Sequence, residues 1–205
     1  TVSSAINNYG TRFIIGSPFN NGQAVTSGGD VKIFSYNSST QTVTQEFISY
    51  ATTNQDSYGS SVAMNDAGDI VAIGASGANG SAGYCRTFKK ISGSWNLLPD
   101  LININPNEFF GASVALNGDG TILAVGAPYA IVNLDVYAGY VKVYEYNGTT
   151  WIQKGSTITG SWGNTEIFGQ SLDINQTGDR IFIGGPLGNA NDTGVGYIFD
   201  SNGSD

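Results

Sequence analysis

The sequence contains no histidine and only one cysteine, Cys85. Without an imidazole, neither a histidine-dependent catalytic triad nor a histidine-based zinc site can form, and the commonest general base is missing. A single cysteine cannot form a disulfide within the chain. No stretch approaches 18 consecutive apolar residues, so the sequence predicts no membrane-spanning helix.

Positive charge is also scarce. The 205 residues include 8 Lys and Arg against 16 Asp and Glu, which gives a formal charge of −8. Nucleic acid is therefore not an expected partner, because phosphate binding needs a basic surface. Only 12% of the residues are charged and 40% are apolar, so we expect a folded protein with the neutral, polar surface common in extracellular proteins.

A pattern that occurs four times dominates the rest of the sequence. Its copies begin at Ser3, Tyr58, Phe110 and Phe168 and read SSAINNYGTRFIIGSP, YGSSVAMNDAGDIVAIGAS, FGASVALNGDGTILAVGAP and FGQSLDINQTGDRIFIGGP. The glycines that close the copies are Gly16, Gly74, Gly126 and Gly184, at intervals of 58, 52 and 58 residues. A period of this length with several strand signals per unit is typical of β-propellers and repeat arrays. The repeats span residues 1–57, 58–109, 110–167 and 168–205.

The third repeat predicts four antiparallel strands. Ser113–Asn117 is a short strand, and the glycines of the following Asn-Gly-Asp-Gly sequence allow a tight turn. Thr121–Val125 is apolar throughout, which is typical of a strand buried on both faces. Gly139–Tyr146 and Trp151–Thr159 flank an Asn-Gly hairpin signal and give the third and fourth strands. The expected class is therefore all-β, since no segment has helical periodicity.

The other repeats follow the same plan. The third strand recurs at Asp30–Tyr36, Gly83–Lys90 and Gly196–Asp200, and the fourth near Val43–Tyr50 and Trp95–Ile104. The last repeat ends after its third strand, so the count is about fifteen strands. The chain does not begin with methionine, and no secretory leader is recognisable. We expect either that a leader has been removed or that the chain is part of a longer polypeptide.

The copies resemble FG-GAP repeats, the blades of the integrin α-subunit propeller and of many surface proteins. The run from Phe110 to Pro128 matches the family pattern of Phe-Gly, Ser-Val-Ala, Asp-Gly and Val-Gly-Ala-Pro almost letter for letter. The resemblance covers essentially the whole chain and implies a β-propeller of four-stranded antiparallel blades. Four repeats are visible, the last incomplete, which favours a piece of a larger propeller over a four-bladed ring or an open array.

In integrin-type repeats, the turn between the first two strands is often a calcium loop, which needs six to eight oxygen ligands. The corresponding side chains here are Asn65, Asp66 and Asp69 in the second repeat, Asn117 and Asp119 in the third, and Asn175 and Asp179 in the fourth. None of these sets completes a cage, so we expect the side chains to cap the backbone of hairpin turns. No cofactor or metal is expected; a weak Ca²⁺ site completed by main-chain carbonyls is the alternative.

Family ligands usually meet the face built from the loops between strands two and three and between blades. These loops span Pro18–Gly29, Ser76–Ala82, Pro128–Ala138 and Pro186–Val195, with connectors near Asp56, Glu108 and Trp162. The candidate ligand-binding residues are the aromatic Phe19, Tyr129, Tyr137 and Trp162 and the acidic Glu108, Asp135 and Asp192. The alternative for each is packing or a solvated loop position.

Other notable residues occupy repeat-equivalent positions or sequons. Cys85 aligns with Val31, Val141 and Ile198, Arg86 with Lys32 and Lys142, and Trp95 with Trp151. This alignment predicts a buried structural thiol, a repeated cation and two tryptophans that pack between blades. N-glycosylation sequons occur at Asn37, Asn79, Asn147, Asn175, Asn191 and Asn202. They are sites only in a eukaryotic secretory route, and otherwise mark favoured turn residues.

Three functions are compatible with these features. The leading hypothesis is a non-enzymatic recognition or adhesion module that is extracellular or displayed on a cell or virion surface, with loops that bind a protein or a glycan. The second is a structural building block of a virion, fibre or extracellular sheath, in which blade edges or flat faces make the assembly contacts. The third is an enzyme acting on polysaccharide, which would need paired carboxylates such as Glu108, Asp135 or Asp192.

Overall fold

The computed structural model describes residues 2–21, 25–161, 165–188 and 193–201. The first sheet consists of β1 (Ser3–Ile6), β2 (Arg12–Ser17), β3 (Asp30–Asn37) and β4 (Thr42–Tyr50). The second consists of β5 (Tyr58–Met64), β6 (Ile70–Ala75), β7 (Tyr84–Ile91), β8 (Ser94–Leu97) and β9 (Leu101–Ile102). The third consists of β10 (Ser113–Leu116), β11 (Ile122–Ala127), β12 (Tyr140–Tyr146) and β13 (Trp151–Thr159). The fourth consists of β14 (Ser171–Ile174), β15 (Arg180–Gly185) and β16 (Val195–Asp200).

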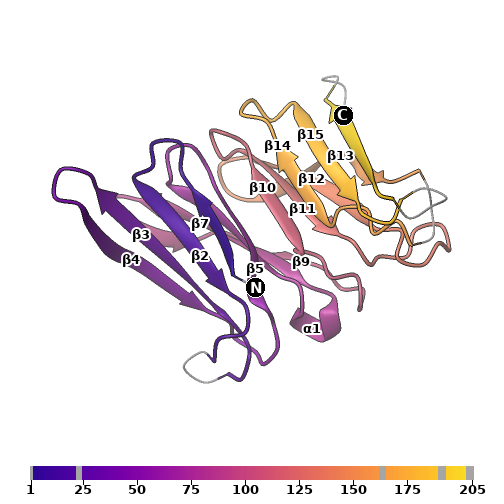
Figure 1. Ribbon diagram of the computed structural model, residues 1–205, viewed down its shortest axis with the longest axis horizontal. Coiled ribbons are helices and arrows are strands. Elements are labelled where there is room, and N and C mark those ends of the chain that lie inside the picture. Colours follow the sequence, from indigo (N-terminus) through magenta and orange to yellow (C-terminus); the bar gives the residue numbers. More distant parts are fainter. Residues whose placement is uncertain (1, 22–24, 162–164, 189–192, 202–205) are drawn as a thin grey trace.

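The four sheets are antiparallel and lie in one row, from the first in indigo to the fourth in yellow (Figure 1). Their first strands lie side by side, because β5 contacts both β1 and β10, and β10 contacts β14. The all-β class is thus confirmed, with one sheet in each of the four repeat ranges. The described residues close neither a ring nor a barrel, so the propeller stays a prediction.

Neighbouring sheets meet at a contact between two glycines. Gly111, with a φ of 87°, places its carbonyl oxygen against Gly74 of the preceding sheet. A Cβ on Gly74 would lie 1.9 Å from this oxygen, so no larger residue fits without movement. The Ser61 hydroxyl donates a 2.8 Å hydrogen bond to the same oxygen. The arrangement recurs with Ser3, Gly16 and Gly59 and with Ser113, Gly126 and Gly169. The repeated glycines and serines of the sequence are therefore contacts between sheets.

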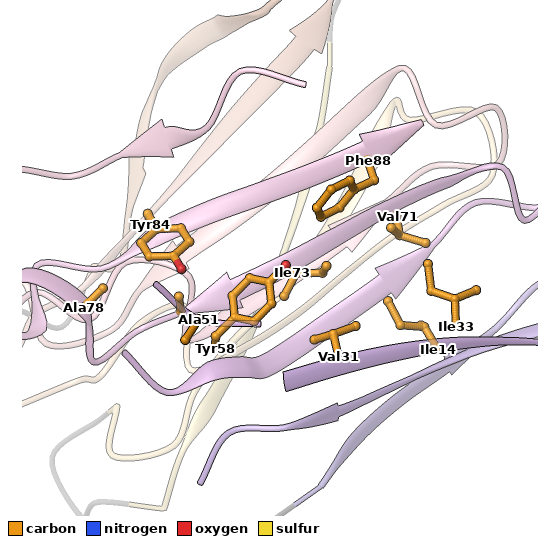
Figure 2. Close-up of a cluster of buried hydrophobic side chains, with 11 residues drawn as sticks. Ile14, Val31, Ile33, Ala51, Tyr58, Val71, Ile73, Ala78, Tyr84 and Phe88 are labelled. Carbon is orange, nitrogen blue, oxygen red and sulfur yellow. The ribbon is translucent and has the colours of Figure 1, made fainter. Parts of the chain in front are cut away.

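Apolar side chains fill the space between the sheets. Figure 2 shows Ile14, Val31 and Ile33 of the first sheet facing Tyr58, Val71 and Ile73 of the second, and all six are 0% exposed. The strands β6 and β11 are buried at every position, because each has a neighbouring sheet on both faces. In β15, by contrast, buried and exposed positions largely alternate, because only one face of the fourth sheet is covered.

Two elements differ from the sequence-based expectation. The fourth strand of the second repeat, expected from Trp95 to Ile104, is divided into β8 and β9, because Pro99 has no N–H to donate to a continuous ladder. The described part of the chain therefore has sixteen strands, where about fifteen were expected. A short turn, α1 (Ala78–Ser81), follows β6 and was not expected; within it, Asn79 and Gly80 have left-handed φ values of 53° and 66°. No helix in the described ranges is long and apolar enough to cross a membrane.

The single cysteine is buried as predicted. Cys85 is 0% exposed, and burial raises the pKa of its thiol to about 12. It opposes Gly74 in the β6–β7 pair, as Val141 opposes Gly126 in the third sheet. In the fourth sheet, Gly184 is opposed by Gly196. The predicted alignment of Cys85 with Ile198 was therefore wrong by two residues, since Gly196 occupies the position of Cys85. The prediction aligned the repeated Gly-Tyr dipeptides, but in β16 this dipeptide lies two positions further along the strand than in β7.

Candidate functional site

The structure describes five of the seven candidate ligand-binding residues. Tyr129, Asp135 and Tyr137 lie in loop 128–138 of the third sheet, Glu108 lies in the connector that enters this sheet, and Phe19 lies in the loop after β2. Trp162 and Asp192 lie outside the described residues. Phe19 is 64% exposed, but the second sheet separates its sheet from the third. The structure therefore concentrates the candidates at the third sheet.

Two of the predicted aromatic residues, Tyr129 and Tyr137, lie side by side. Their ring centroids are 5.6 Å apart at an interplanar angle of 85°. Phe109 adds a third ring, whose centroid lies 5.0 Å from that of Tyr129 at 60°. These edge-to-face contacts are the arrangement that aromatic quadrupoles favour. We call Phe109, Tyr129 and Tyr137 the aromatic cluster; Tyr137 is 47% exposed.

Sequence reasoning missed Phe109. It stands directly before the repeated Phe110, where the corresponding residues of the other repeats are Ser57 and Ile167. The signal that could have found it is this doubled aromatic, which occurs in the third repeat alone. Because the repeat pattern does not require an aromatic residue at this position, Phe109 is explained by a contact specific to the third repeat. That contact is with Tyr129.

The repeat scaffold holds the backbone of the aromatic cluster. Phe109 and Tyr137 both have a φ of 56°, in the left-handed region. Positive φ recurs at the residues that correspond to Phe109, which are Ser57 and Ile167. It also recurs at those that correspond to Tyr137, which are Ser27 and Ser81. The Phe109 N–H donates to the Ser81 carbonyl at 2.8 Å, and the Ile167 N–H donates to the Tyr137 carbonyl at 2.9 Å. Each loop is thus tied through its backbone to the connector that enters the next sheet.

Glu108 is engaged within the protein. Its carboxylate accepts hydrogen bonds from the Tyr140 hydroxyl at 2.8 Å, from Asn103 Nδ2 at 2.8 Å and from Asn105 Nδ2 at 3.0 Å. Burial and this carboxylate raise the pKa of Tyr140. The preceding sheet has a longer version of the contact, in which the Tyr84 hydroxyl lies 3.5 Å from a carboxylate oxygen of Asp56. Glu108 therefore holds the connector in place, and its role as a ligand anchor stays a prediction.

A cleft of about 290 Å³ lies between the loop of the aromatic cluster and the end of β13. Its lining residues are Val132, Asn133, Asp135, Ala138, Thr159, Gly160 and Ser161. Asp135 is held in a tight turn, since its N–H donates to the Val132 carbonyl at 2.9 Å and its own carbonyl accepts the Val132 N–H at 3.1 Å. The cleft offers amide, hydroxyl and carboxylate groups, so it suits a neutral ligand rich in hydroxyl groups.

The turns between the first two strands use their asparagines as predicted. Asn65 Oδ1 accepts the N–H groups of Asp69 at 3.0 Å and Ile70 at 2.9 Å, and Asn65 Nδ2 donates to the Asp69 carboxylate at 2.8 Å. Asn7, Asn117 and Asn175 accept backbone N–H groups in the same way. Among the residues that the structure describes, no group of three or more His, Cys, Asp or Glu side chains could hold a metal ion.

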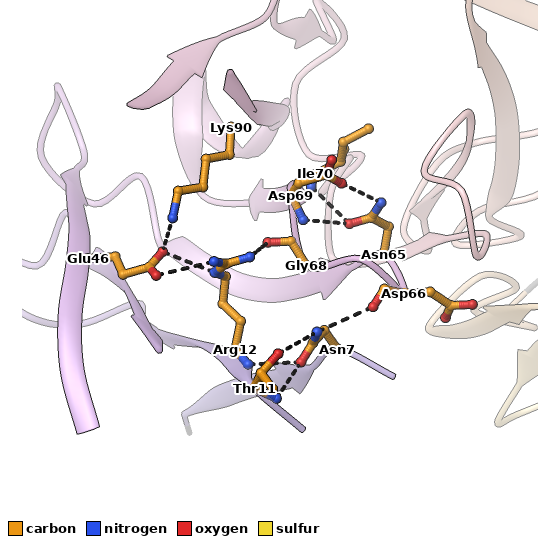
Figure 3. Close-up of polar contacts among 10 residues, drawn as sticks. All are labelled: Asn7, Thr11, Arg12, Glu46, Asn65, Asp66, Gly68, Asp69, Ile70 and Lys90. Atoms are coloured by element: carbon orange, nitrogen blue, oxygen red, sulfur yellow. Dashed lines mark hydrogen bonds and ion pairs between the residues drawn. The ribbon is translucent and has the colours of Figure 1, made fainter. Parts of the chain in front are cut away.

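An ionic cluster joins the first two sheets on the side of these turns. Glu46 accepts from Arg12 at 3.0 Å and from Lys90 of the second sheet at 2.7 Å, while Arg12 also donates to the Gly68 carbonyl at 2.8 Å (Figure 3). Burial alone would raise the pKa of Glu46, but the hydrogen bonds from Lys90 and Arg12 hold it below its usual value. The cluster therefore links the first two sheets.

The described sequons occupy turns or loops. Asn37 and Asn147 lie in equivalent hairpins, where each Oδ1 accepts two backbone N–H groups at distances between 2.9 and 3.2 Å. Asn79 belongs to α1, and Asn175 caps its own turn. Asn191 and Asn202 lie outside the described residues. Glycosylation stays a prediction, and the hydrogen bonds explain these asparagines as turn residues.

Trp95 and Trp151 pack between sheets, which confirms the predicted packing role of these two residues. Trp151 Nε1 donates to the buried Thr87 hydroxyl of the preceding sheet at 2.9 Å. The Trp95 ring centroid lies 6.0 Å from that of Phe47, again in the preceding sheet.

Arg86 opposes Ile73 in the ladder, and its bidentate ion pair with Asp100 makes it a structural cation.

No family model matches the chain, and a search of curated proteins finds no significant match. The resemblance to FG-GAP repeats therefore rests on the sequence pattern alone.

Proposed function

We propose that the chain is an FG-GAP-like β-propeller module that acts by recognition and not by catalysis, at an extracellular site or on a cell or virion surface. Its ligand is a neutral glycan, which binds at the aromatic cluster and the cleft beside it. The observation that carries the proposal is the pairing of partly exposed aromatic rings with a polar cleft in loop 128–138.

The chemistry of the site favours a sugar over a charged or fully apolar ligand. The C–H face of a pyranose ring packs against the electron-rich face of an aromatic ring, which Tyr137 offers at 47% exposure. The cleft supplies hydrogen-bonding groups from Asn133, Asp135 and Ser161. Among the described residues, no basic side chain, which a phosphate or sulfate group would require, lines this cleft.

The repeated sheet contacts support the propeller. The glycine pairs, the serine hydrogen bonds and the turn contacts recur at three successive interfaces between sheets. The first strands of the four sheets lie next to one another along one side of the row. A propeller is built from such blades around a central axis. Catalysis is disfavoured because the carboxylate of Glu108 is engaged by three side-chain donors.

A glycan array tests the proposal. We expect the chain to bind a subset of neutral glycans, and the variant Tyr129→Ala/Tyr137→Ala to lose that binding at least tenfold, which corresponds to about 1.4 kcal/mol. The matched control is Tyr9→Ala, which removes a 73% exposed tyrosine from the first sheet. Binding that survives the double substitution, or an array without signal, would contradict the proposal; capture of a protein ligand instead would assign these loops to protein recognition.

A structural role is the second candidate, and one observation favours it. Phe182 and Ile198 on the outer face of the fourth sheet are 50% and 66% exposed, whereas Ala124 and Thr87, at corresponding positions of inner sheets, are 0% exposed. An apolar sheet face of this kind can make assembly contacts. Analytical ultracentrifugation tests it: a strictly monomeric chain at high concentration would remove this candidate.

A further inference from the structure

The loop between β11 and β12 contains a narrow hairpin with an apolar tip. This connection is longer than the one between β6 and β7. Its middle forms a two-residue turn, because Val132 and Asp135 exchange backbone hydrogen bonds at 3.1 and 2.9 Å. The central residues Asn133 and Leu134 have φ values of 52° and 76°, as a type I′ turn requires. We call residues 131–136 the hairpin tip.

Leu134 does not suit this turn on folding grounds. The second central position of a type I′ turn favours glycine, because a residue with a Cβ is strained in the left-handed region. The Leu134 side chain is 91% exposed, so packing within the chain does not offset this strain. A strained residue of this kind is typical of a functional position, and an exposed leucine points to an apolar contact outside the chain.

The two faces of the hairpin tip differ in chemistry. Val132 and Asp135 line the polar cleft, so the one charged side chain of the tip lies on the cleft side. Ile131 and Val136 point to the opposite side, because neighbouring residues of an extended strand alternate, and both are exposed. Both sheets that flank the third are described, so this exposure does not depend on what adjoins the first or the fourth sheet.

The order of these side chains matches a lipid surface. Leu134 and Ile131 are apolar enough for the hydrocarbon, and the partly exposed Tyr137 follows them, as tyrosine is favoured at membrane interfaces. The cleft beside the tip offers hydrogen-bonding groups to a polar headgroup. A specific protein interface buries roughly 800 Å² on each partner, which three aliphatic side chains on a hairpin cannot supply. A bilayer requires no such area, so it is the better occupant.

The charges at this end of the sheets favour a neutral lipid. Asp30 and Asp56 are buried here, and the carboxylate of Glu108 is engaged by three side-chain donors. Loop 128–138 contains no lysine or arginine, and the chain has a formal charge of −8. Anionic lipids attract basic segments, so this surface is not suited to them.

We propose that the chain binds the headgroup of a neutral glycolipid while the hairpin tip inserts into the bilayer. The inference rests on the proposed function, because the cleft and the aromatic cluster hold the sugar. It adds the lipid to the ligand, so a glycan on a membrane binds more tightly than the same glycan in water. Burial of the Leu134 side chain is enough for a gain of at least tenfold, which corresponds to about 1.4 kcal/mol.

Vesicle flotation tests the inference. The probes are phosphatidylcholine vesicles with and without a synthetic glycolipid that carries a glycan bound on the array, and the same glycan in solution. We expect the unaltered chain to bind the glycolipid vesicles at least tenfold more tightly than the free glycan. Leu134→Asn should lose this excess but keep its affinity for the free glycan and its melting temperature, since asparagine tolerates the left-handed region. The matched control Leu97→Asn, which removes a 56% exposed leucine from β8, should keep the excess.

A dye on the hairpin tip measures insertion directly. Leu134→Cys and Leu97→Cys can each be labelled with an environment-sensitive fluorophore, because the native thiol of Cys85 is buried. Glycolipid vesicles should raise the fluorescence at position 134 several-fold and leave it unchanged at position 97. Equal responses at the two positions would overturn insertion of the tip.

The outcomes separate the inference from the proposed function. Binding of the free glycan without an excess for vesicles, or an equal excess in Leu134→Asn, would overturn the inference and leave the glycan site intact. Equal binding to vesicles with and without the glycolipid would overturn the role of the headgroup. Self-association that Leu134→Asn abolishes would assign the tip to a second copy and overturn the inference. A chain that binds neither the free glycan nor the vesicles would contradict the proposed function itself.

Discussion

The glycine contact between sheets gives a prediction with a control built into the chain. Gly74→Ala would place a Cβ 1.9 Å from the Gly111 carbonyl oxygen and 2.4 Å from Ser61 Oγ. Ordinary carbon contacts lie near 3.5–4.0 Å, so the second and third sheets must separate locally by about 1.5 Å. Gly184→Ala adds the same methyl group at the corresponding position of the fourth sheet. There the three atoms nearest to the Cβ all belong to Ser171, and the nearest is a hydroxyl at 2.6 Å that can rotate away.

The two substitutions should therefore differ strongly in stability. Overpacking costs about 1–3 kcal/mol, and loss of the Ser61 hydrogen bond adds about 1 kcal/mol, so we expect Gly74→Ala to lower the free energy of unfolding by about 3 kcal/mol. Gly184→Ala should change it by less than about 0.5 kcal/mol, because none of the described sheets covers the site. At about 2–4 °C per kcal/mol, the melting temperature falls by about 6–12 °C for the first variant only.

Thermal and urea unfolding followed by circular dichroism measure this difference. Both variants keep the strand backbone, because neither Gly74 nor Gly184 has a positive φ. Equal destabilisation by the two substitutions would refute the reasoning, since it would show that the cost lies in the strand itself. An unchanged melting temperature for Gly74→Ala would show that the sheets do not meet as described.

Three further outcomes follow from the structure. Because the pKa of Glu46 is lowered in the folded state, its ionised carboxylate contributes to folding stability at pH values above its ordinary pKa of 4.5. This contribution is lost as the pH falls through the lowered pKa. Glu46→Gln should weaken the fall in the free energy of unfolding at low pH. An unchanged fall at low pH would argue against the bond between Glu46 and Lys90. Cys85 should not react with a thiol reagent in the native chain at pH 8, because burial raises its pKa to about 12, and rapid labelling without denaturant would contradict this burial. Trp151→Phe should lower the free energy of unfolding by about 1–2 kcal/mol. A double-mutant cycle with Thr87→Val should show a coupling energy of about 1 kcal/mol, and zero coupling would show that the hydrogen bond does not stabilise the fold.

The sequence predicted the parts of the fold that one repeat determines by itself. The asparagine turns, the apolar second strands and the paired tryptophans follow from local patterns that recur at fixed spacing. The break at Pro99 was readable from its missing N–H but was overlooked. The shift of Gly196 was not readable, because the register of β16 depends on its pairing with β15 and not on the Gly-Tyr dipeptide.

The candidate site was predictable in part for the same reason. Tyr129 and Tyr137 lie in a long loop, so loop length alone drew attention to them. Their contact at 5.6 Å, and the third ring of Phe109, arise because the connector and the loop are tied together across the sheet. Glu108 looked like a free acidic residue, but its three donors come from segments that the sequence does not place beside it.

Calorimetric titration with a glycan selected on the array tests the central claim most directly. Three proteins would be compared: the unaltered chain, Tyr137→Ala in the aromatic cluster, and Phe19→Ala in the loop of the first sheet. The account predicts that Tyr137→Ala weakens binding at least tenfold and that Phe19→Ala, although it removes a 64% exposed ring, leaves affinity unchanged. Full affinity in Tyr137→Ala, or a loss confined to Phe19→Ala, would contradict the assignment of the site to the third sheet.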